Sequence, residues 1–400
     1  MDSGSVAWML AASALVLFMT PGLAFFYGGL VRGKNAISTV MYSFVAIGVV
    51  SVVWVLWGYS LAFGEGGDFI GNFDFLGFKD VASESDESTP PMLFAIFQMM
   101  FAIITPALIT GAIAERFKFT TYLIFLVAWV TFVYAPIAHW VWASDGWLLR
   151  LGALDFAGGT VVHINAGVAA IAAAWLVGKR RGVDRGVEPH NVPFVILGAS
   201  ILWFGWFGFN AGSGLAANGQ AVSAFLVTNT AAATALVAWL ILGHIHTGKM
   251  SAVGAATGAV AGLVAITPAA GFVGPMGSIA IGLGAGVLTF YAVRIRHKFG
   301  FDDALEVMAV HGIGGIWGAL ATGIFAVGGI GLIDGDAKVL GYNAVAVLST
   351  IAYSFVVTFV ILKILDVIPG LGLRADDAAE DAGLDVSLHG ERAYVGDGAD

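Results

Sequence analysis

The sequence has no cysteine among its 400 residues. Disulfide bonds, thiolate metal sites and cysteine nucleophiles are therefore excluded. Charged residues are also scarce: they make up 11% of the chain, whereas a soluble domain usually contains about 25%. Hydrophobic residues account for 58%, and the mean hydropathy is +0.88. This composition predicts an all-α polytopic membrane protein.

Long apolar runs occupy most of the chain. The first, residues 6–31, is preceded by no basic residue, so it is interpreted as a permanent helix rather than a signal peptide. A bilayer-spanning helix needs about 20 apolar residues. Ten further runs come near that length, and the chain is predicted to form eleven transmembrane helices; these further runs are 37–63, 91–113, 119–141, 159–178, 192–212, 221–246, 250–269, 277–296, 305–329 and 340–368.

Basic residues between the runs predict the orientation. With the N-terminus outside, the outer loops contain only Lys79, Arg150 and Lys338. The inner loops then contain Arg32, Lys34, Arg116, Lys118, Lys179, Arg180, Arg181, Arg185, Lys249, Arg294, Arg296 and Lys298. The positive-inside rule therefore places the N-terminus outside and the C-terminus in the cytosol. Aromatic residues near the outer helix ends are then expected to form an interfacial belt, namely Trp54, Trp57, Tyr59, Trp140, Trp142 and Trp147.

Two histidines in matching apolar contexts suggest two related halves. His163 lies in the fifth helix of a first half, about 1–178, and His311 in the fifth helix of a second half, 192–329. An odd helix number per half reverses the orientation of the second, which gives an inverted 5+5 repeat with a site at the interface. Helix 340–368 is the eleventh. It completes a transmembrane domain over 1–369, followed by a cytosolic tail over 370–400.

The paired histidines are candidate functional residues because ionisable groups at membrane depth are costly. One alone would be read as a buried histidine bonded to a carbonyl. Two in matching positions favour a pore, in which neutral imidazoles offer one donor and one acceptor each. Within four residues of either one there is no thiolate, carboxylate or third histidine, which disfavours a metal site.

Aromatic motifs point to a pore mouth and a gate. Phe97 and Phe101 are four residues apart, so they lie on one helical face, and Gln98 directly follows Phe97. Ordinary packing is the alternative interpretation. The run Leu202–Gly214 alternates aromatics with glycines, and a ring cluster can attract a cation for about 0.5–2 kcal/mol. An aromatic belt is the alternative there.

Carboxylates occur at the starts of the two histidine helices. Asp155 precedes the fifth helix, and the segment Asp302–Glu306 opens the tenth. Capping and the helix dipole are sufficient to explain both. A carboxylate at position 155 could also stabilise an approaching cation indirectly.

Taken together, these strings resemble the ammonium transporter (Amt/Mep/Rh) family, prokaryotic Amt type. The resemblance covers nearly the whole chain. It rests on Pro21-Gly22, Phe25–Leu30, Lys34-Asn35, Phe97-Gln98, Phe101, Ala114–Arg116, Ala135–Trp140, Asp155–Gly159, the aromatic run, and the tail strings Gly383–Asp385 and His389–Tyr394. One departure concerns the inner vestibule, where Glu306 stands in place of an aspartate five residues before the second histidine.

The resemblance implies a homotrimer in the cell membrane, each protomer with its own pore and without a cofactor. It implies that Trp142, Ser213 and Phe101 form an outer ammonium-binding site, and that Phe101 and Phe209 form a stacked gate. His163, His311 and Trp206 would line the pore, and Asp155, Phe97 and Gln98 would support the outer site. A PII-type regulatory protein is implied as a partner of the cytosolic face.

The expected activity is ammonium transport by deprotonation near the gate and passage of ammonia along the histidines, with the proton returned or carried separately. Three alternatives remain open at this stage. The chain could be an ammonium sensor that signals through its tail. It could be a channel for water or urea, although that would not need a cation-attracting mouth. A membrane enzyme would need a nucleophile–base pair or metal cluster, and none is evident.

Overall fold

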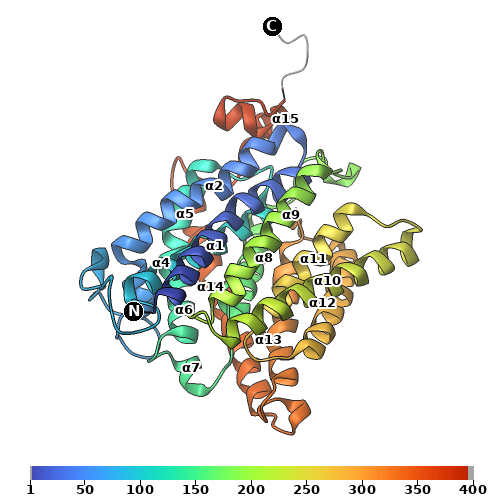
Figure 1. The fold of residues 1–400 in the computed structure, drawn as a ribbon. Helices are drawn as coiled ribbons and strands as arrows, with labels where there is room; N and C mark the ends of the chain where they lie inside the picture. Colours follow the sequence, from blue (N-terminus) through green and yellow to red (C-terminus); the bar gives the residue numbers. More distant parts are fainter. Residues whose placement is uncertain (1, 395–400) are drawn as a thin grey trace.

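The computed structural model describes residues 2–394, and within them the side chains of Arg185, His297 and Phe299 are left aside. These residues form an all-α bundle (Figure 1). The only β pairing in this range is a single bridge between Phe117 and Arg374. The expected all-α membrane fold is confirmed.

The apolar runs become helices, several of them continued through a wide π-helical turn. The membrane helices are α1 (Ser3–Leu30), α2 (Ala36–Val53) with η2 (Trp54–Gly58) and α3 (Tyr59–Phe63), α4 (Pro91–Ile113), α5 (Phe119–Trp129) with η4 (Val130–Tyr134) and α6 (Ala135–Trp142), η5 (Gly159–Ile164) with α8 (Asn165–Val177), α9 (Val192–Trp206) with η7 (Phe207–Ala211), α10 (Gly219–Thr247), α11 (Ala252–Ile266), α12 (Pro275–Ile295), η9 (Met308–Ile313) with α13 (Gly314–Phe325), and α14 (Lys338–Val367).

Short elements complete the chain. They are η1 (Gly33–Asn35), η3 (Leu76–Phe78), α7 (Trp147–Leu151), η6 (Val183–Arg185), η8 (Arg296–Phe299), η10 (Leu332–Asp334), α15 (Asp377–Ala382) and η11 (Asp385–His389). Within residues 2–394, ten helical segments are long and apolar enough to cross a membrane. The eleventh predicted span, α11, is a shorter apolar helix of 15 residues.

Capping residues set where several helices begin. α1 begins at Ser3, earlier than its apolar run, because the Asp2 carboxylate accepts the N–H groups of Gly4 and Ser5. Asn218 and Ser251 cap α10 and α11 in the same way. Such caps satisfy N–H groups that have no partner inside the helix.

Close helix contacts join the two halves. α1 packs along α9, the first helix of each half. A Cβ added to Gly198 would lie 2.2 Å from the backbone nitrogen of Phe26, and one added to Gly29 would lie 2.6 Å from the Asn191 carbonyl oxygen. Small residues are needed wherever membrane helices approach this closely. Deeper in the bundle, α8 contacts η9 and α13 contacts η5, so the two histidine helices pack reciprocally.

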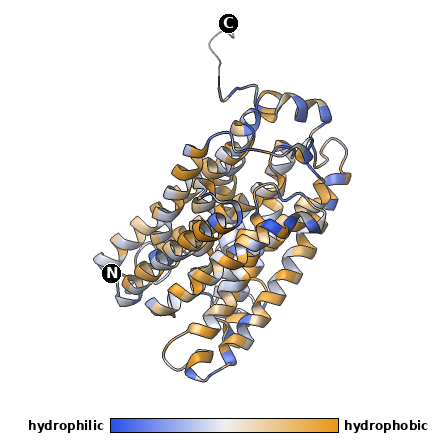
Figure 2. Ribbon diagram, turned by 90° about the vertical axis from the view of Figure 1, so that its right-hand side faces the viewer, coloured by the Kyte–Doolittle hydropathy of each residue, from blue (hydrophilic) through white to orange (hydrophobic). Residues whose placement is uncertain are grey.

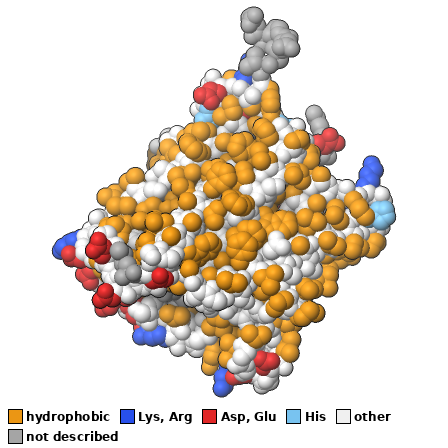
Figure 3. Space-filling model, viewed as in Figure 1, with side chains coloured by type: hydrophobic (Ala, Val, Ile, Leu, Met, Phe, Trp, Pro, Cys, Tyr) orange, Lys and Arg blue, Asp and Glu red, His pale blue; other side chains and the backbone are white. Residues whose placement is uncertain are grey.

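The surface is apolar around the middle of the bundle and polar at its two ends. Figure 3 shows a continuous hydrophobic surface with acidic and basic side chains along its left and bottom edges and along its top and right edges, and Figure 2 shows polar residues gathered near the helix ends. Exposed side chains of the apolar zone include Phe44, Trp175, Val237 and Leu348. This distribution suits a protein surrounded by lipid.

The interfacial belt expected from the sequence is wrong for three of its six members. Trp54, Tyr59 and Trp140 are buried in the protein and cannot face lipid. The two indoles have internal partners: the N–H of Trp54 donates to the Ala95 carbonyl, and that of Trp140 donates to the Phe69 carbonyl. Rings of the loop after α3 pack on Tyr59 and Trp140, and Tyr134 packs on Trp54. The sequence pattern did not reveal these contacts.

The C-terminal tail folds onto one end of the bundle, which we call the tail end (loops 31–35, 114–118 and 178–191, with residues 371–394). Figure 1 shows α15 at the top and α7, at the opposite or far end, near the bottom. The Asp385 carboxylate accepts the N–H groups of Ile37 and Ser38 at the start of α2. Lys34 donates to the carbonyls of Glu380 and Asp381. Residues 395–400 of the predicted tail lie outside the described residues.

Candidate functional site

Three cavities lie in series between the two ends of the bundle: the stacked rings of Phe101 and Phe209 separate the first two, and the last two share lining residues. The far-end pocket has a volume of about 120 Å³ and is lined by Phe94, Phe97, Gln98, Phe101, Trp142, Phe156, Ser213 and Leu215. A central tube of about 10 Å³ follows. The tail-end vestibule, at about 550 Å³, is the largest of the three, and Phe26 and His311 line both it and the tube.

The far-end pocket combines aromatic faces with a hydroxyl acceptor. The ring of Trp142 lies edge-on to Phe101 at 5.8 Å, and its indole N–H donates to the Asp155 carbonyl at 3.0 Å. The Ser213 hydroxyl donates to the Phe209 carbonyl at 2.8 Å. The oxygen lone pairs of Ser213 therefore remain free to accept a hydrogen bond from a bound cation. The buried Oε1 of Gln98 has no partner among the described residues.

Two phenyl rings separate this pocket from the tube. Phe101 of α4 and Phe209 of η7 stack with centroids 4.2 Å apart and planes inclined by 33°. Both side chains are buried. Phe97, one turn before Phe101, supports it edge-on at 4.9 Å. A molecule that passes from pocket to tube must displace these rings.

The tube holds the two histidines in an otherwise apolar lining. Nδ1 of His163 and Nδ1 of His311 are 3.2 Å apart, and the ring planes are inclined by 29°. When both rings are neutral, one Nδ1 must donate to the other, so the two residues hold opposite tautomers. His163 also stacks against Trp206 at 5.5 Å, whose indole N–H is used by Thr267 Oγ1. The remaining lining is aliphatic or aromatic: Met19, Leu23, Phe26, Ile104, Leu108, Val162, Leu202, Phe209 and Val260.

Each histidine is positioned by a carboxylate eight residues earlier. Asp155 Oδ1 accepts the N–H groups of Gly158 and Gly159 at 2.8 and 2.6 Å, and Oδ2 accepts that of Thr160 at 2.8 Å. These bonds start the wide turn η5 that carries His163. At the matching place in the second half, Asp303 accepts the N–H groups of residues 307 and 308 at 3.1 and 2.7 Å and starts η9.

Each histidine is also followed four residues later by a glycine that faces the other histidine helix. A Cβ on Gly167 would lie 2.3 Å from the Gly312 nitrogen, and one on Gly315 would lie 3.1 Å from the Cβ of His163. The sequence interpretation missed Asp303, Gly167 and Gly315 as positioning residues. Matching the two halves on their histidines would have shown the shared Asp–x7–His–x3–Gly spacing.

The aromatic run contributes less to the pore than its composition indicated. Trp206 and Phe209 face the tube. Phe207 instead stacks flat on Phe225 of α10 at 3.9 Å, and Phe204 is exposed on the outside of the bundle. Helical geometry causes this division, because neighbouring residues on a helix point in different directions.

A balanced cluster of buried charges holds the loops of the tail end together. Arg180 donates to Asp302 through Nε at 2.8 Å and through Nη2 at 2.9 Å. Arg32 pairs with Glu115 at 2.8 Å. Burial acts to raise the pKa of Asp302, but the hydrogen bond and charge of Arg180 outweigh it and lower that pKa to about 2. Burial itself lowers the pKa of Arg116 to about 10.

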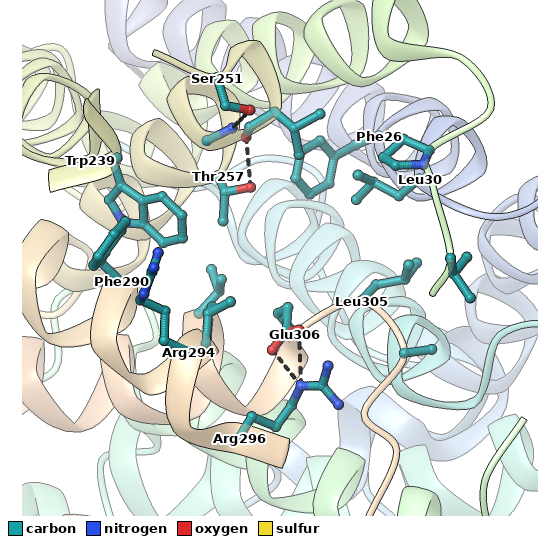
Figure 4. A pocket seen from close by; sticks show the side chains of 18 of the residues that line it. Phe26, Leu30, Trp239, Ser251, Thr257, Phe290, Arg294, Arg296, Leu305 and Glu306 are labelled. Atoms are coloured by element: carbon teal, nitrogen blue, oxygen red, sulfur yellow. Dashed lines mark hydrogen bonds and ion pairs between the residues drawn. The ribbon is translucent and has the colours of Figure 1, made fainter. Parts of the chain in front are cut away.

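The expectation that capping explains the whole segment 302–306 is therefore wrong for two of its three acids. Only Asp303 caps a helix. Asp302 is paired with Arg180, and Glu306 is paired with Arg296 at 2.8 Å on the wall of the vestibule (Figure 4). The partner of Asp302 comes from the loop after α8, which is far away in sequence, whereas Arg296 lies directly after α12, ten residues before Glu306. Helix spacing alone does not reveal either pairing.

The structure brings together the residues that the resemblance assigned to the site. The pocket contains Trp142, Ser213, Phe101, Phe97 and Gln98, and the tube contains Phe209, Trp206, His163 and His311. Asp155 accepts the indole N–H of Trp142 through its carbonyl. In residues 2–394 no group of three or more histidine or acidic side chains is placed to share a metal ion. A multi-pass helical bundle crossed by a narrow passage has the architecture of a membrane transporter or channel.

Comparison with known proteins identifies the family. The sequence profile of the Ammonium Transporter Family matches residues 7–394. The ammonium transporter of Bacillus subtilis (strain 168) is 48% identical over 404 residues, covering 98% of this chain and 99% of that protein. Ammonium transporter Amt1 of Archaeoglobus fulgidus is 47% identical over 401 residues, with 99% and 100% covered.

Solved structures agree. Saccharomyces cerevisiae Mep2 matches with a TM-score of 0.89 at 38% identity, covering 94% of this chain and 88% of that chain. A sensor Amt protein matches with a TM-score of 0.89 at 35% identity, covering 96% and 98%. The chain belongs to the ammonium transporter family.

Proposed function

We propose that this protein binds ammonium in the far-end pocket, removes a proton near the Phe101–Phe209 stack and conducts ammonia through the histidine tube. The observation that supports this most directly is the lining of the tube. Among its described residues, the histidine pair alone offers free polar atoms, and no lining residue carries a carboxylate.

Energetics favour passage of the neutral species. Moving a small ion from water into a dry interior costs on the order of 20 kcal/mol by an idealised Born estimate. Cation–π contacts return roughly 2 kcal/mol at best. The tube volume of about 10 Å³ leaves room for about one water molecule, so a hydration shell cannot accompany the ion. Ammonia carries no charge and can hydrogen-bond to the imidazoles.

The far-end pocket is suited to bind ammonium before it loses its proton. Trp142 and Phe101 present π faces and edges around it, and Ser213 offers its lone pairs. The Asp155 carboxylate accepts four backbone N–H groups there. Its negative charge remains near the pocket and favours a cation without direct contact. The proton released at the stack returns to the far end or crosses separately over the shared Nδ1 contact.

The test is transport in proteoliposomes by His163→Ala combined with His311→Ala. Without imidazoles, ammonia in the tube loses its hydrogen-bond partner, a cost of about 2 kcal/mol, equivalent to roughly a thirtyfold slower rate. Methylammonium uptake and ammonium-induced current are both measured. The surface histidine variant His246→Ala is the matched control, because that ring lies outside the passage at the end of α10.

An unchanged rate and unchanged ion selectivity in the double variant would contradict the conduction role. A variant that loses selectivity and passes other cations would still support it, because the widened tube would then admit water with the ion. Competition of ammonium against urea in the same vesicles separates this function from a channel for neutral solutes.

We further propose that the far end is extracellular and the tail end cytosolic, with the protein in the cell membrane as a homotrimer. The concentration of basic loop residues at the tail end supports this orientation. The apolar groove between α1 and α10, lined by Trp8, Phe207, Val222 and Phe225, suits a partner copy. Native mass spectrometry of the purified protein tests the oligomer.

Ammonium sensing through the tail is a second candidate function. The sensor Amt protein among the structural neighbours and the tail folded over the vestibule loops favour it. Such signalling would engage a PII-type protein at the cytosolic face. A transport-dead variant that still changes partner binding when ammonium is added would favour sensing, and loss of both together would favour transport alone.

A further inference from the structure

The tail-end vestibule contains one carboxyl group at the point where the tube opens. Of the described residues that line this cavity, Glu306 is the single acidic one, and it shares the cavity with His311. Figure 4 shows its carboxyl group facing Arg296 across the cavity wall. A solute that leaves the tube at His311 therefore enters the space that contains this group.

The backbone fixes Glu306 next to the tube. Its carbonyl oxygen accepts the N–H of Val310, the residue before His311, at 2.9 Å. Its φ of +65° lies in the left-handed region, which a residue with a side chain rarely adopts. This conformation separates Glu306 from Asp302 and Asp303, which are buried and already used by Arg180 and by the start of η9.

Arg296 is placed to stabilise the carboxylate form of Glu306, and the Glu306 side chain stays partly exposed to the vestibule. Its Nε lies 2.9 Å from Oε1 and 2.8 Å from Oε2 of Glu306. The Glu306 side chain is still 22% exposed. The carboxyl group can therefore exchange protons with water in the vestibule while its anion has a partner ready.

The surroundings of Glu306 bring the pKa of its carboxyl group close to neutral pH. Burial and the nearby charge of Asp303 raise the pKa of Glu306 to about 8, against the opposing effect of Arg296. An acid whose pKa is near the working pH is the most effective proton donor and acceptor. The charged groups around it are Asp302 and Asp303 on its own loop, Arg180 from the loop after α8, Arg294 and Arg296 from the end of α12, and Lys249 before α11.

We propose that Glu306 is the proton donor that converts ammonia to ammonium as it leaves the tube, which rests on the proposed function above. The O–H bond of the Glu306 carboxyl group breaks, the proton joins the ammonia lone pair, and ammonium and a carboxylate result. Arg296 stabilises that carboxylate. Water of the vestibule then returns a proton to Glu306, so the cytosolic side supplies the proton. The reaction is downhill, because a simple amine such as lysine has a pKa of about 10.4.

The experiment compares Glu306→Gln and Glu306→Asp with the unmodified protein in proteoliposomes of one orientation. Methylammonium uptake is measured while only the pH at the tail end is varied. We expect Glu306→Gln to slow uptake about tenfold near pH 7, a modest effect for a positioned acid because water also donates. The ratio of the unmodified to the Gln rate should approach one above pH 9, where Glu306 has lost its proton. Glu306→Asp should keep a pH-dependent ratio with a shifted midpoint.

A structural role would behave differently, because breaking the Arg296 pair would lower the rate by the same factor at every pH. A constant ratio across the pH range, or equal rates for Gln and the unmodified protein, would overturn the proposal. Lys298→Gln controls for a change of charge at the tail end outside the cavity. If the unmodified protein transported no methylammonium or ammonium at all, the proposed function would fail instead, which keeps the two results distinguishable.

Discussion

Asp155→Asn is the substitution whose effect the structure defines most closely. The carboxylate accepts three N–H groups at 2.8 Å or less, two on Oδ1 and one on Oδ2. In asparagine, the remaining oxygen keeps the first two as neutral bonds, which are weaker by about 1 kcal/mol each. The amide nitrogen replaces Oδ2 and leaves the Thr160 N–H and the more distant Val161 N–H without this acceptor, which costs about 1–3 kcal/mol. The Thr160 hydroxyl, which donates to Oδ2, can rotate to accept from the new amide. We therefore expect a loss of about 4 kcal/mol in local stability.

The loss should appear as misplacement of His163. The N–H groups of Val162 and His163 both bond to the Gly158 carbonyl, so this turn depends on the loop that Asp155 holds. If the turn frays, the 3.2 Å contact between the histidines is lost. Each oxygen of Asp303 accepts a single such N–H. Asp303→Asn would therefore weaken one bond and remove the other, and its effect on stability should be smaller.

Thermal unfolding in detergent and methylammonium uptake in proteoliposomes measure the two effects separately. Asp334→Asn is the control, because Asp334 accepts a single N–H, that of Gly329, on the exposed far-end surface. An Asp155→Asn protein with an unchanged unfolding midpoint would refute the hydrogen-bond accounting. One with a lowered midpoint but full transport would refute the positioning of His163 as a requirement.

Two further predictions concern the packing and the charges around the path. Gly167→Ala should lower the unfolding midpoint and slow uptake, because the new methyl group would lie 2.3 Å from the Gly312 nitrogen; Gly219→Ala, in open space, is the control, and equal midpoints would contradict the argument. The Asp302–Arg180 pair should stabilise the fold by about 2 kcal/mol above pH 4, since its pKa falls from 3.8 to about 2. Because the folded pKa is the lower one, this contribution is lost as pH falls from about 4 to 2. Unfolding midpoints measured across that window should decline less in Asp302→Asn, and equal slopes would rule the pair out.

Much of the fold followed from local sequence properties. Helix positions were predictable because a bilayer requires about 20 apolar residues per span, and most segment ends agree with the helices within a few residues. The π-helical turns at the histidines were not predictable in this way. They depend on Asp155 and Asp303, which accept backbone N–H groups across a glycine-rich or irregular start.

The site was predictable to a similar degree. The pattern of His163, His311, Phe101 and Phe209 resembled a known family, and the structure brings these residues into one passage. The belt assignment of Trp54 was wrong because the burial of a ring depends on what packs against it, and here Tyr134 does so from a helix distant in sequence.

The sequence by itself determined that this protein is a many-spanning helical membrane protein with two histidines at matching depth, because hydropathy and charge are properties of each segment alone. Only the tertiary structure decided that the two imidazoles share an Nδ1 contact, that Asp303 acts as the counterpart of Asp155, and that Glu306 faces the vestibule paired with Arg296. The histidine contact depends on the distance between helices that are far apart in sequence, and the two carboxylate contacts depend on the local backbone conformation. Neither quantity is encoded in composition.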